Sequence, residues 1–385
     1  MLRRECRWLV FAVGLGIMLS LGMPAVSQRE EPESLAPFVP TPMKVVRAML
    51  KLANVTKDDV VYDLGCGDGR IVIEAAKRFG AHGVGVDIDP QRIRESNENA
   101  QRRGVTDRVE FRLEDAMKTD LTKATVVTMY LLTEANLKLR PKLFRELKPG
   151  TRVVSHAFAM GDWEADKVIH VQAGYSRTVY FWMIPARVGG IWQWTEETPH
   201  GAVQCVLRVQ QEFQKVKGVV TIGERSVPIT NAKLVGRELT FSIAPMPDRD
   251  VVVTYQGVVN GNIIRGVRIV RDAKQPWQAK RMPVKLDGLW RWKVMTPDGE
   301  IGAGLRILHD QKGIIKMAYV SDGKETTLWE SYAWGANIRF SVNVDTPRGK
   351  RMLTFRGFVE GDKITGSISC TQWDEDADWV AHRVK

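Results

Sequence analysis

Residues Val60-Val61-Tyr62-Asp63-Leu64-Gly65-Cys66-Gly67-Asp68-Gly69 join a short apolar run to a glycine-rich turn, and residues 70–79 follow with helical spacing. A short apolar run bounded by glycines is typical of a buried strand, and glycine allows the backbone to turn tightly into a helix. The stretch therefore predicts a strand–turn–helix unit of an α/β sheet.

The same alternation continues along the chain. Further strands are predicted at 83–86, 109–113, 125–129 and 152–155, helices at 91–103 and 136–147, and a hairpin of 167–172 with 177–184. Five alternating units and a terminal hairpin predict a Rossmann-like, seven-stranded, mostly parallel sheet over residues 40–187.

Ligands of such sheets bind beyond the carboxyl ends of the strands, where Asp63, Asp87 and Asp115 are expected. Asp63 and Asp68 flank the glycine turn, and their carboxylates would repel the pyrophosphate of a dinucleotide, whereas the ammonium and sulfonium of S-adenosylmethionine favour nearby carboxylates. We therefore expect S-adenosylmethionine as the cofactor. The candidate cofactor-binding residues are Asp63, Gly65, Cys66, Gly67, Gly69, Asp87, Asp115 and Thr128.

At these residues the chain resembles the class I, seven-β-strand, S-adenosylmethionine-dependent methyltransferases. Within that class it is similar to the small protein-lysine methyltransferases typified by the broad-specificity archaeal enzyme and the mitochondrial ATP-synthase c-subunit lysine methyltransferase. The resemblance runs from about Pro37 to Pro185 and rests on segments 37–42, 62–71, 124–132, 139–143 and 147–156, and on Trp163. It implies methyl transfer to lysine side chains of a protein substrate.

Three residues are candidates for the methyl-acceptor side. The aromatic face of Tyr130 can hold a cationic amine, His156 can accept a proton, and Trp163 can close a substrate channel. Each has a structural alternative: a packed strand-end tyrosine, a hydrogen-bonded histidine and a core tryptophan. Asn136 is a weaker candidate, because a residue near a helix N-terminus can serve only as a cap.

Some chemistries are disfavoured. The strand-four end reads Thr128-Met129-Tyr130-Leu131 and lacks the Asn/Asp-Pro-Pro-aromatic turn common in enzymes that methylate adenine N6 or glutamine. The chain has no cysteine pair of the kind used on RNA cytosine, and no metal site is expected. Methylation of a small molecule or lipid of the cell envelope remains an alternative, as does a cofactor-binding protein without turnover.

The C-terminal half contains two similar segments. Gly190-Ile191-Trp192-Gln193-Trp194 recurs as Gly288-Leu289-Trp290-Arg291-Trp292, and further matches follow in order at a spacing of 98–102 residues. Alternating apolar and polar residues predict two all-β units, sandwich or small barrel, at 188–284 and 285–385. Their tryptophans are expected in the cores, with an exposed platform for a protein or glycan partner as the alternative. The acidic run at 374–378 is expected to be a loop.

The N-terminus has the pattern of a signal peptide. Arg3, Arg4 and Arg7 precede an apolar run at 8–23 and the small-residue site Ala25-Val26-Ser27. We expect residues 1–27 to be a signal peptide or an N-terminal membrane anchor, followed by a linker at 28–39. The protein is then exported or associated with the envelope, which conflicts with the cytoplasmic supply of the cofactor.

The composition restricts the number of domains and the classes of protein that are possible. The 385 residues suit two or three domains, and 44% hydrophobic residues exclude a wholly disordered chain. The formal net charge of +11 suggests nucleic acid, but residues 28–187 carry 25 basic and 22 acidic side chains. We therefore see no strong nucleic-acid signal. Cys66, Cys205 and Cys370 give no reason to expect a disulfide.

Overall fold

The computed structural model describes residues 36–198, 201–246, 251–310, 315–328 and 330–384. The predicted signal peptide and most of the predicted linker lie outside these residues. Within the described part of the chain, no helix is long and apolar enough to cross a membrane.

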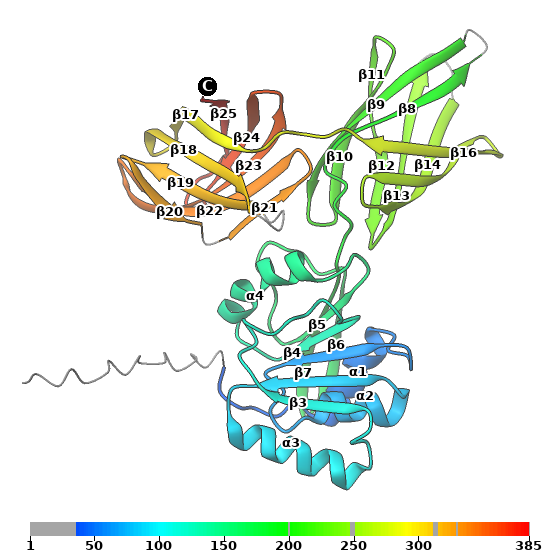
Figure 1. Ribbon diagram of the computed structural model, residues 1–385, viewed down its shortest axis with the longest axis vertical. Helices are drawn as coiled ribbons and strands as arrows, with labels where there is room; N and C mark the ends of the chain where they lie inside the picture. The colour runs from blue at the N-terminus through cyan, green and yellow to red at the C-terminus, as the bar shows by residue number, and fades with distance from the viewer. Residues whose placement is uncertain (1–35, 199–200, 247–250, 311–314, 329, 385) are drawn as a thin grey trace, which may run out of the picture. The chain divides into compact units, whose positions relative to one another are not determined.

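The first part of the chain forms one mixed sheet (Figure 1). Its strands are β1 (Val60–Leu64), β2 (His82–Asp87), β3 (Val109–Leu113), β4 (Val126–Met129), β5 (Arg152–His156), β6 (Lys167–Ala173) and β7 (Tyr175–Met183). Their order is β3-β2-β1-β4-β5-β7-β6; β7 runs antiparallel to both of its neighbours, β5 and β6, and the other neighbouring strands pair in parallel fashion. The predicted seven-stranded, mostly parallel sheet is confirmed. Its strand order reverses between β1 and β4, the usual place for a ligand.

Among the residues that the structure describes, four helices accompany this sheet: α1 (Met43–Leu52), α2 (Arg70–Phe79), α3 (Pro90–Arg103) and α4 (Thr133–Glu146). Glycines in the left-handed conformation bound α2, with φ of 77° at Gly69 and 71° at Gly80. Asp89 caps α3 by accepting a hydrogen bond from the Gln91 N–H at 2.7 Å. The sequence-based prediction contained α2, α3 and α4 but not α1.

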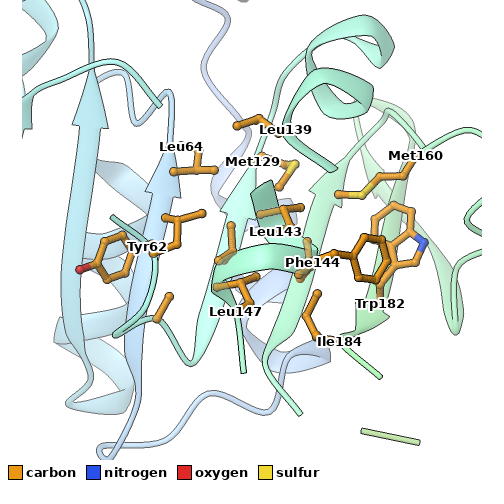
Figure 2. Close-up of a cluster of buried hydrophobic side chains, with 14 of the residues drawn as sticks. Tyr62, Leu64, Met129, Leu139, Leu143, Phe144, Leu147, Met160, Trp182 and Ile184 are labelled. Carbon is orange, nitrogen blue, oxygen red and sulfur yellow. The ribbon is translucent and has the colours of Figure 1, made fainter. Parts of the chain in front are cut away.

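Side chains alternate between the two faces of the strands, so each face has its own core. One core packs Val61 and Val126 with the apolar side chains of α1 and α2. The other packs Leu64 and Met129 with α4 (Figure 2). Because Asp63 follows the parity of Val61, its carboxyl lies on the α1 face of the sheet.

The rest of the chain forms two antiparallel sheets with the same strand order. The first, β11-β10-β9-β8-β16-β15-β14-β13-β12, comprises β8 (Gly190–Thr198), β9 (Gly201–Glu212), β10 (Lys215–Ile222), β11 (Arg225–Pro228), β12 (Thr230–Val235), β13 (Glu238–Met246), β14 (Val251–Asn260), β15 (Ile263–Val270) and β16 (Ala273–Arg281). The second, β20-β19-β18-β17-β25-β24-β23-β22-β21, comprises β17 (Gly288–Thr296), β18 (Gly299–His309), β19 (Ile315–Ser321), β20 (Lys324–Thr327), β21 (Glu330–Trp334), β22 (Asn337–Thr346), β23 (Gly349–Glu360), β24 (Lys363–Ser369) and β25 (Ala377–Arg383). We call them the first and second β units.

Each β unit is one continuous sheet around its own core, which favours a barrel-like curl over the sandwich alternative. The recurring tryptophans are buried, as expected of core residues, and the exposed-platform alternative is wrong for them. They are Trp192, Trp194 and Trp277 in the first unit and Trp290, Trp292 and Trp379 in the second. The acidic residues at 374–376 are exposed and precede β25.

Candidate functional site

The glycine turn between β1 and α2 forms one wall of the candidate cofactor site. Gly65, Gly67 and Gly69 have φ of 75°, 55° and 77°, a region that disfavours side chains. A Cβ at Gly67 would also clash with the ring of Phe38. The N–H groups of Gly65 and Cys66 both donate to the carbonyl of Val86, at 2.9 Å each, so the turn is fixed to β2.

Two carboxylates close this turn from the strand ends. Asp87, the last residue of β2, accepts hydrogen bonds from the N–H of Gly67 at 2.9 Å and of Asp89 at 3.0 Å. Asp63 lies on β1 with only 2% of its surface exposed, and it accepts a 2.7 Å hydrogen bond from the Thr128 hydroxyl. The structure thus brings Asp63, Asp87 and Thr128 together with the turn, as expected.

Burial, aided by the charges of Asp87 and Asp68 and opposed by the hydrogen bond from Thr128, raises the pKa of Asp63 to about 7. The carboxylates of Asp63, Asp68 and Asp87 together therefore carry more negative charge than the neighbouring groups of the protein compensate. An ammonium or a sulfonium placed here would stabilise the ionised form of Asp63. This set of groups fits S-adenosylmethionine and disfavours a phosphate-bearing cofactor.

Two predicted cofactor residues have less direct support. Asp115 lies two residues beyond β3, where one carboxylate oxygen accepts a 2.8 Å hydrogen bond from the Met117 N–H. The thiol of Cys66 is buried beside the Ser96 hydroxyl, and burial together with nearby carboxylates raises its pKa well above the usual value. This thiol belongs to the wall of the site. Cofactor contacts of both residues stay predictions.

The predicted acceptor residues Tyr130 and His156 lie against each other, with ring centroids 3.9 Å apart and planes tilted by 37°. The register explains this contact: Thr128 pairs with Val154 across β4 and β5, and Tyr130 and His156 each follow by two residues. Tyr130 therefore lies on the same face as Thr128 and Asp63, beyond the strand ends. It is half-buried, so part of its surface stays accessible to a substrate.

His156 has the surroundings of a structural histidine. It is fully buried, and its Nδ1 lies 3.1 Å from the Thr41 hydroxyl. Burial, aided by the charge of Arg177, lowers its pKa to about 4. At neutral pH the ring is uncharged and far too weak a base to drain a lysine ammonium of ordinary pKa about 10.4. The geometry favours the hydrogen-bonded alternative over the proton acceptor.

Trp163 is 1% exposed and lies in the hydrophobic core. Its ring packs against Phe144, Trp182 and Phe213, with centroids 4.5, 5.6 and 6.0 Å away. Its indole N–H donates to Gln214 at 3.0 Å. These contacts are those of a packing residue, and a channel-closing role stays a prediction.

A segment before α1, residues 37–42, forms part of the site, although no residue of it was a candidate. Thr41 contacts His156 through its hydroxyl, and its carbonyl accepts a 2.8 Å hydrogen bond from Arg70. Arg70 also pairs with Asp68 at 2.6 Å, which joins the segment to the glycine turn. Phe38 covers Gly67 while the guanidinium of Arg92 lies 4.4 Å from the centre of its ring. The three prolines of 37–42 were the available signal, since they indicate an ordered, non-helical approach.

Asn136 is not a helix cap, because the N-cap position of α4 is Leu132. Its side-chain amide instead donates to the carbonyls of Phe158 at 3.1 Å and Ala159 at 3.3 Å. Its side-chain oxygen is buried and has no partner within the described part of the chain. Asn136 thus anchors the loop that leaves β5.

Comparison with known proteins agrees with this site. Residues 63–167 match the family model described as ANTKMT methyltransferase domain. A protein-lysine N-methyltransferase of Saccharolobus islandicus is 53% identical over 150 residues, which are 38% of this chain and 93% of that protein. The human lysine N-methyltransferase of the ATP synthase c-subunit is 34% identical over 132 residues, which are 34% of this chain and 56% of that protein.

A solved structure was also matched, that of an RNA methyltransferase from Salinibacter ruber in complex with S-adenosyl-L-homocysteine. It is 53% identical, with a TM-score of 0.37, over 38% of this chain and 93% of that chain. The matches with all three proteins cover less than two fifths of this chain, so none extends over both β units. Taken with the seven-stranded sheet and the carboxylates at its strand ends, the family match and the Saccharolobus islandicus relative show that the chain belongs to the S-adenosylmethionine-dependent methyltransferases of the ANTKMT methyltransferase domain family.

Proposed function

We propose that this protein transfers methyl groups to lysine side chains of a protein substrate. The observation that carries the proposal is the row formed by Asp63, Thr128 and Tyr130 on one face of the sheet, with the buried carboxyl of Asp63 at one end and the aromatic ring of Tyr130 at the other. The lysine specificity in the names of the Saccharolobus islandicus and human relatives supports the choice of acceptor.

Asp63, Asp87 and the glycine turn would hold the cofactor, which supplies a methyl group on a sulfonium that is open to in-line displacement. The carboxylates of Asp63 and Asp87 bind and orient cationic groups, and Asp63 loses its proton as a cation approaches. Alignment of the reacting atoms is the main contribution that such a site makes to the rate.

On the acceptor side, Tyr130 presents an aromatic face to an incoming amine. A lysine amine has to be neutral to attack a methyl carbon, and a half-buried site favours the neutral form through desolvation. His156 holds the Tyr130 ring in place and is itself fixed by Thr41. Because His156 is a weak base, the lysine proton leaves to solvent.

We also propose that the protein works in the cell envelope. The support is the sequence pattern of residues 1–27, with arginines before an apolar run and a small-residue site after it. The cofactor would then have to reach the envelope. A fusion of residues 1–40 to a reporter active only outside the cytoplasm should give signal, and a silent reporter with an active cytoplasmic control would contradict export.

Labelled methyl transfer tests the proposed reaction. The full chain is incubated with methyl-labelled S-adenosylmethionine and a cell lysate, and the products are separated into protein, RNA, lipid and small molecules. Label in protein supports the proposal, and peptide mass spectrometry then locates the methylated residue. Label only in lipid or a small molecule favours the envelope alternative, label only in RNA overturns the lysine proposal, and no label with intact cofactor binding indicates a protein without turnover.

A further inference from the structure

The loop that leaves β5 has three successive carbonyls held by one helix. Asn136 of α4 donates to the carbonyls of Phe158 and Ala159, and Arg140, one turn later, donates to the carbonyl of Met160 at 2.7 Å. Residues four apart lie on the same side of a helix, so α4 presents both side chains to this loop. The path of the loop is therefore set by α4.

This loop reaches the acceptor side of the site. The ring of Phe158 stacks on that of Tyr130 with centroids 6.1 Å apart. The Phe158 carbonyl accepts a second hydrogen bond, from the Ser155 hydroxyl at 2.7 Å. A shift of the loop would thus move a ring that contacts the predicted substrate-facing tyrosine.

Arg140 is itself oriented by a residue 190 positions later in the chain. Its Nε and Nη2 each donate to a carboxylate oxygen of Glu330, both at 2.8 Å, in a bidentate pair. Glu330 begins β21 of the second β unit, and the two side chains are 3% and 2% exposed. A buried bidentate pair of this kind fixes the orientation of the two side chains as well as the distance between them.

A second arginine of the same β unit closes the network. Arg339 of β22 pairs with Glu330 at 3.0 Å and with Asp162 of the loop, to which Arg140 also donates at 2.6 Å. Buried charges are tolerated when they are paired, and removal of one partner leaves the others uncompensated. The loop and the second β unit are therefore joined by one set of mutually dependent ion pairs.

Apolar contacts surround this network. Phe144 of α4 packs against Phe213 of the first β unit and against Tyr332 and Trp334 of β21, with ring centroids 5.3–5.7 Å apart. All four rings belong to one buried cluster with Leu139 and Met160. The β units thus share a core with α4 and the loop.

We propose that Glu330 is a positioning residue for methyl transfer. Through Arg140 it holds the Phe158–Asp162 loop, and with it Tyr130, in the arrangement that receives the acceptor. The second β unit then contributes to methyl transfer, because it holds the loop that contacts Tyr130. This inference rests on the proposed function for its kinetic readout, but the state of the loop can be measured without a methyl acceptor.

The test compares Glu330→Gln and Arg140→Lys with the wild type, all as full chains. Glu330→Gln keeps the shape of the side chain without its charge, and Arg140→Lys keeps the charge without the fork. Glu360→Gln is the matched control, because the Arg208–Glu360 pair also joins two parts of the chain but is 43% and 56% exposed. Three quantities are measured for each protein. They are the amide hydrogen exchange of residues 157–163, the cofactor affinity by calorimetry, and kcat and KM on a lysine-containing protein and on a short lysine peptide.

The proposal expects faster exchange in the loop and a fall in kcat on the order of tenfold for both acceptors in both variants. The cofactor Kd should change less than about twofold, because the carboxylates at β1 and β2 are not in the network, and Glu360→Gln should match the wild type. Rescue of loop protection and kcat by Glu330→Asp, relative to Glu330→Gln, would support positioning by charge.

Unchanged loop exchange in both variants overturns the proposal. A rise in KM confined to the protein substrate would indicate that the second β unit docks the substrate, and it would also overturn the proposal. A loss of folding in both variants would overturn it too, because it would indicate a role in the fold alone. If the wild type methylates no lysine, the proposed function fails, and hydrogen exchange in the loop still decides the positioning role.

Discussion

Thr128 donates a 2.7 Å hydrogen bond to Asp63 across neighbouring strands β4 and β1, and both side chains are buried at the point where the sheet reverses its strand order. This is the one hydrogen bond to the Asp63 side chain that the described residues supply. Such a lightly compensated carboxyl is suited to receive a cation.

Cofactor binding should depend on pH through Asp63. With its pKa at about 7 in the free protein, roughly a tenth of Asp63 is ionised at pH 6 and most of it at pH 7.5, so the affinity for S-adenosylmethionine should rise roughly eightfold over this range. The sign follows because a cation binds the ionised form and has to displace the proton at lower pH. Isothermal titration calorimetry at several pH values measures the change.

Asp63→Asn is the control for this pH dependence. The variant should bind more weakly at pH 7.5 and should lose the rise between pH 6 and 7.5, since an amide does not titrate. A wild-type affinity that is flat over this range would contradict the role given to Asp63.

Substitution of Tyr130 separates its ring from its hydroxyl. Tyr130→Phe keeps the ring contact with His156 and the aromatic face, so kcat/KM should fall only a few-fold, whereas Tyr130→Leu should lower it on the order of tenfold through loss of the cation–π contact. Steady-state kinetics on the protein substrate give both values. Equal losses in the two variants would mean that the hydroxyl, and not the ring, carries the function.

His156 should not set the pH dependence of the rate. Because its pKa lies near 4, the ring stays neutral from pH 6 to 8, and His156→Gln should lower kcat without changing the shape of the pH–rate profile in this range. A wild-type inflection near pH 6.5 that disappears in His156→Gln would restore the proton-acceptor interpretation.

The two β units differ at a polar cluster in the core of the first. Glu196 accepts hydrogen bonds from Tyr255 and Trp194 and pairs with Arg268 at 3.2 Å. The strand order and registers put Val294, Phe355 and Ile368 at the positions of Glu196, Tyr255 and Arg268 in the second unit. The second unit thus shows that this architecture can be built with an apolar core at the same positions.

Tyr255→Phe alone should destabilise the first β unit by about 1–3 kcal/mol, because the partly buried carboxylate of Glu196 loses a donor. The combined change Glu196→Val, Tyr255→Phe and Arg268→Ile should cost less than this single change, since it removes the charges together. Hydrogen exchange in β8 and β14 reports the local stability. A combined variant less stable than Tyr255→Phe would mean that the polar cluster stabilises the unit.

The local features of the site could be predicted from the sequence. The glycine turn, Asp63 and Asp87 follow directly from strand and helix patterns that are continuous in the chain, and the bounds of β1 and α2 match the predicted ones. The Tyr130–His156 contact also follows once the sheet is known, because the register of β4 and β5 fixes it.

What could not be predicted depends on contacts between distant segments. Thr41 meets His156 across 115 positions and Arg140 meets Glu330 across 190, and no periodicity connects such residues. The same holds for Trp163, whose burial depends on Phe213 from the first β unit. Roles that rest on an environment, such as the neutral state of His156, need the fold before they can be assigned.

Whether this site transfers methyl groups to lysine can be decided by analysis of the methylated product formed by the wild type and by Asp87→Asn. Asp87→Asn removes a carboxylate that fixes the Gly67 N–H at 2.9 Å and adds to the negative charge of the cofactor cluster. Labelled protein is hydrolysed and its amino acids are separated. We expect label in Nε-methyllysine with the wild type and a loss of at least about tenfold with Asp87→Asn. Label in other products only, or equal label with both proteins, would show that the site does not transfer methyl groups to lysine in this way.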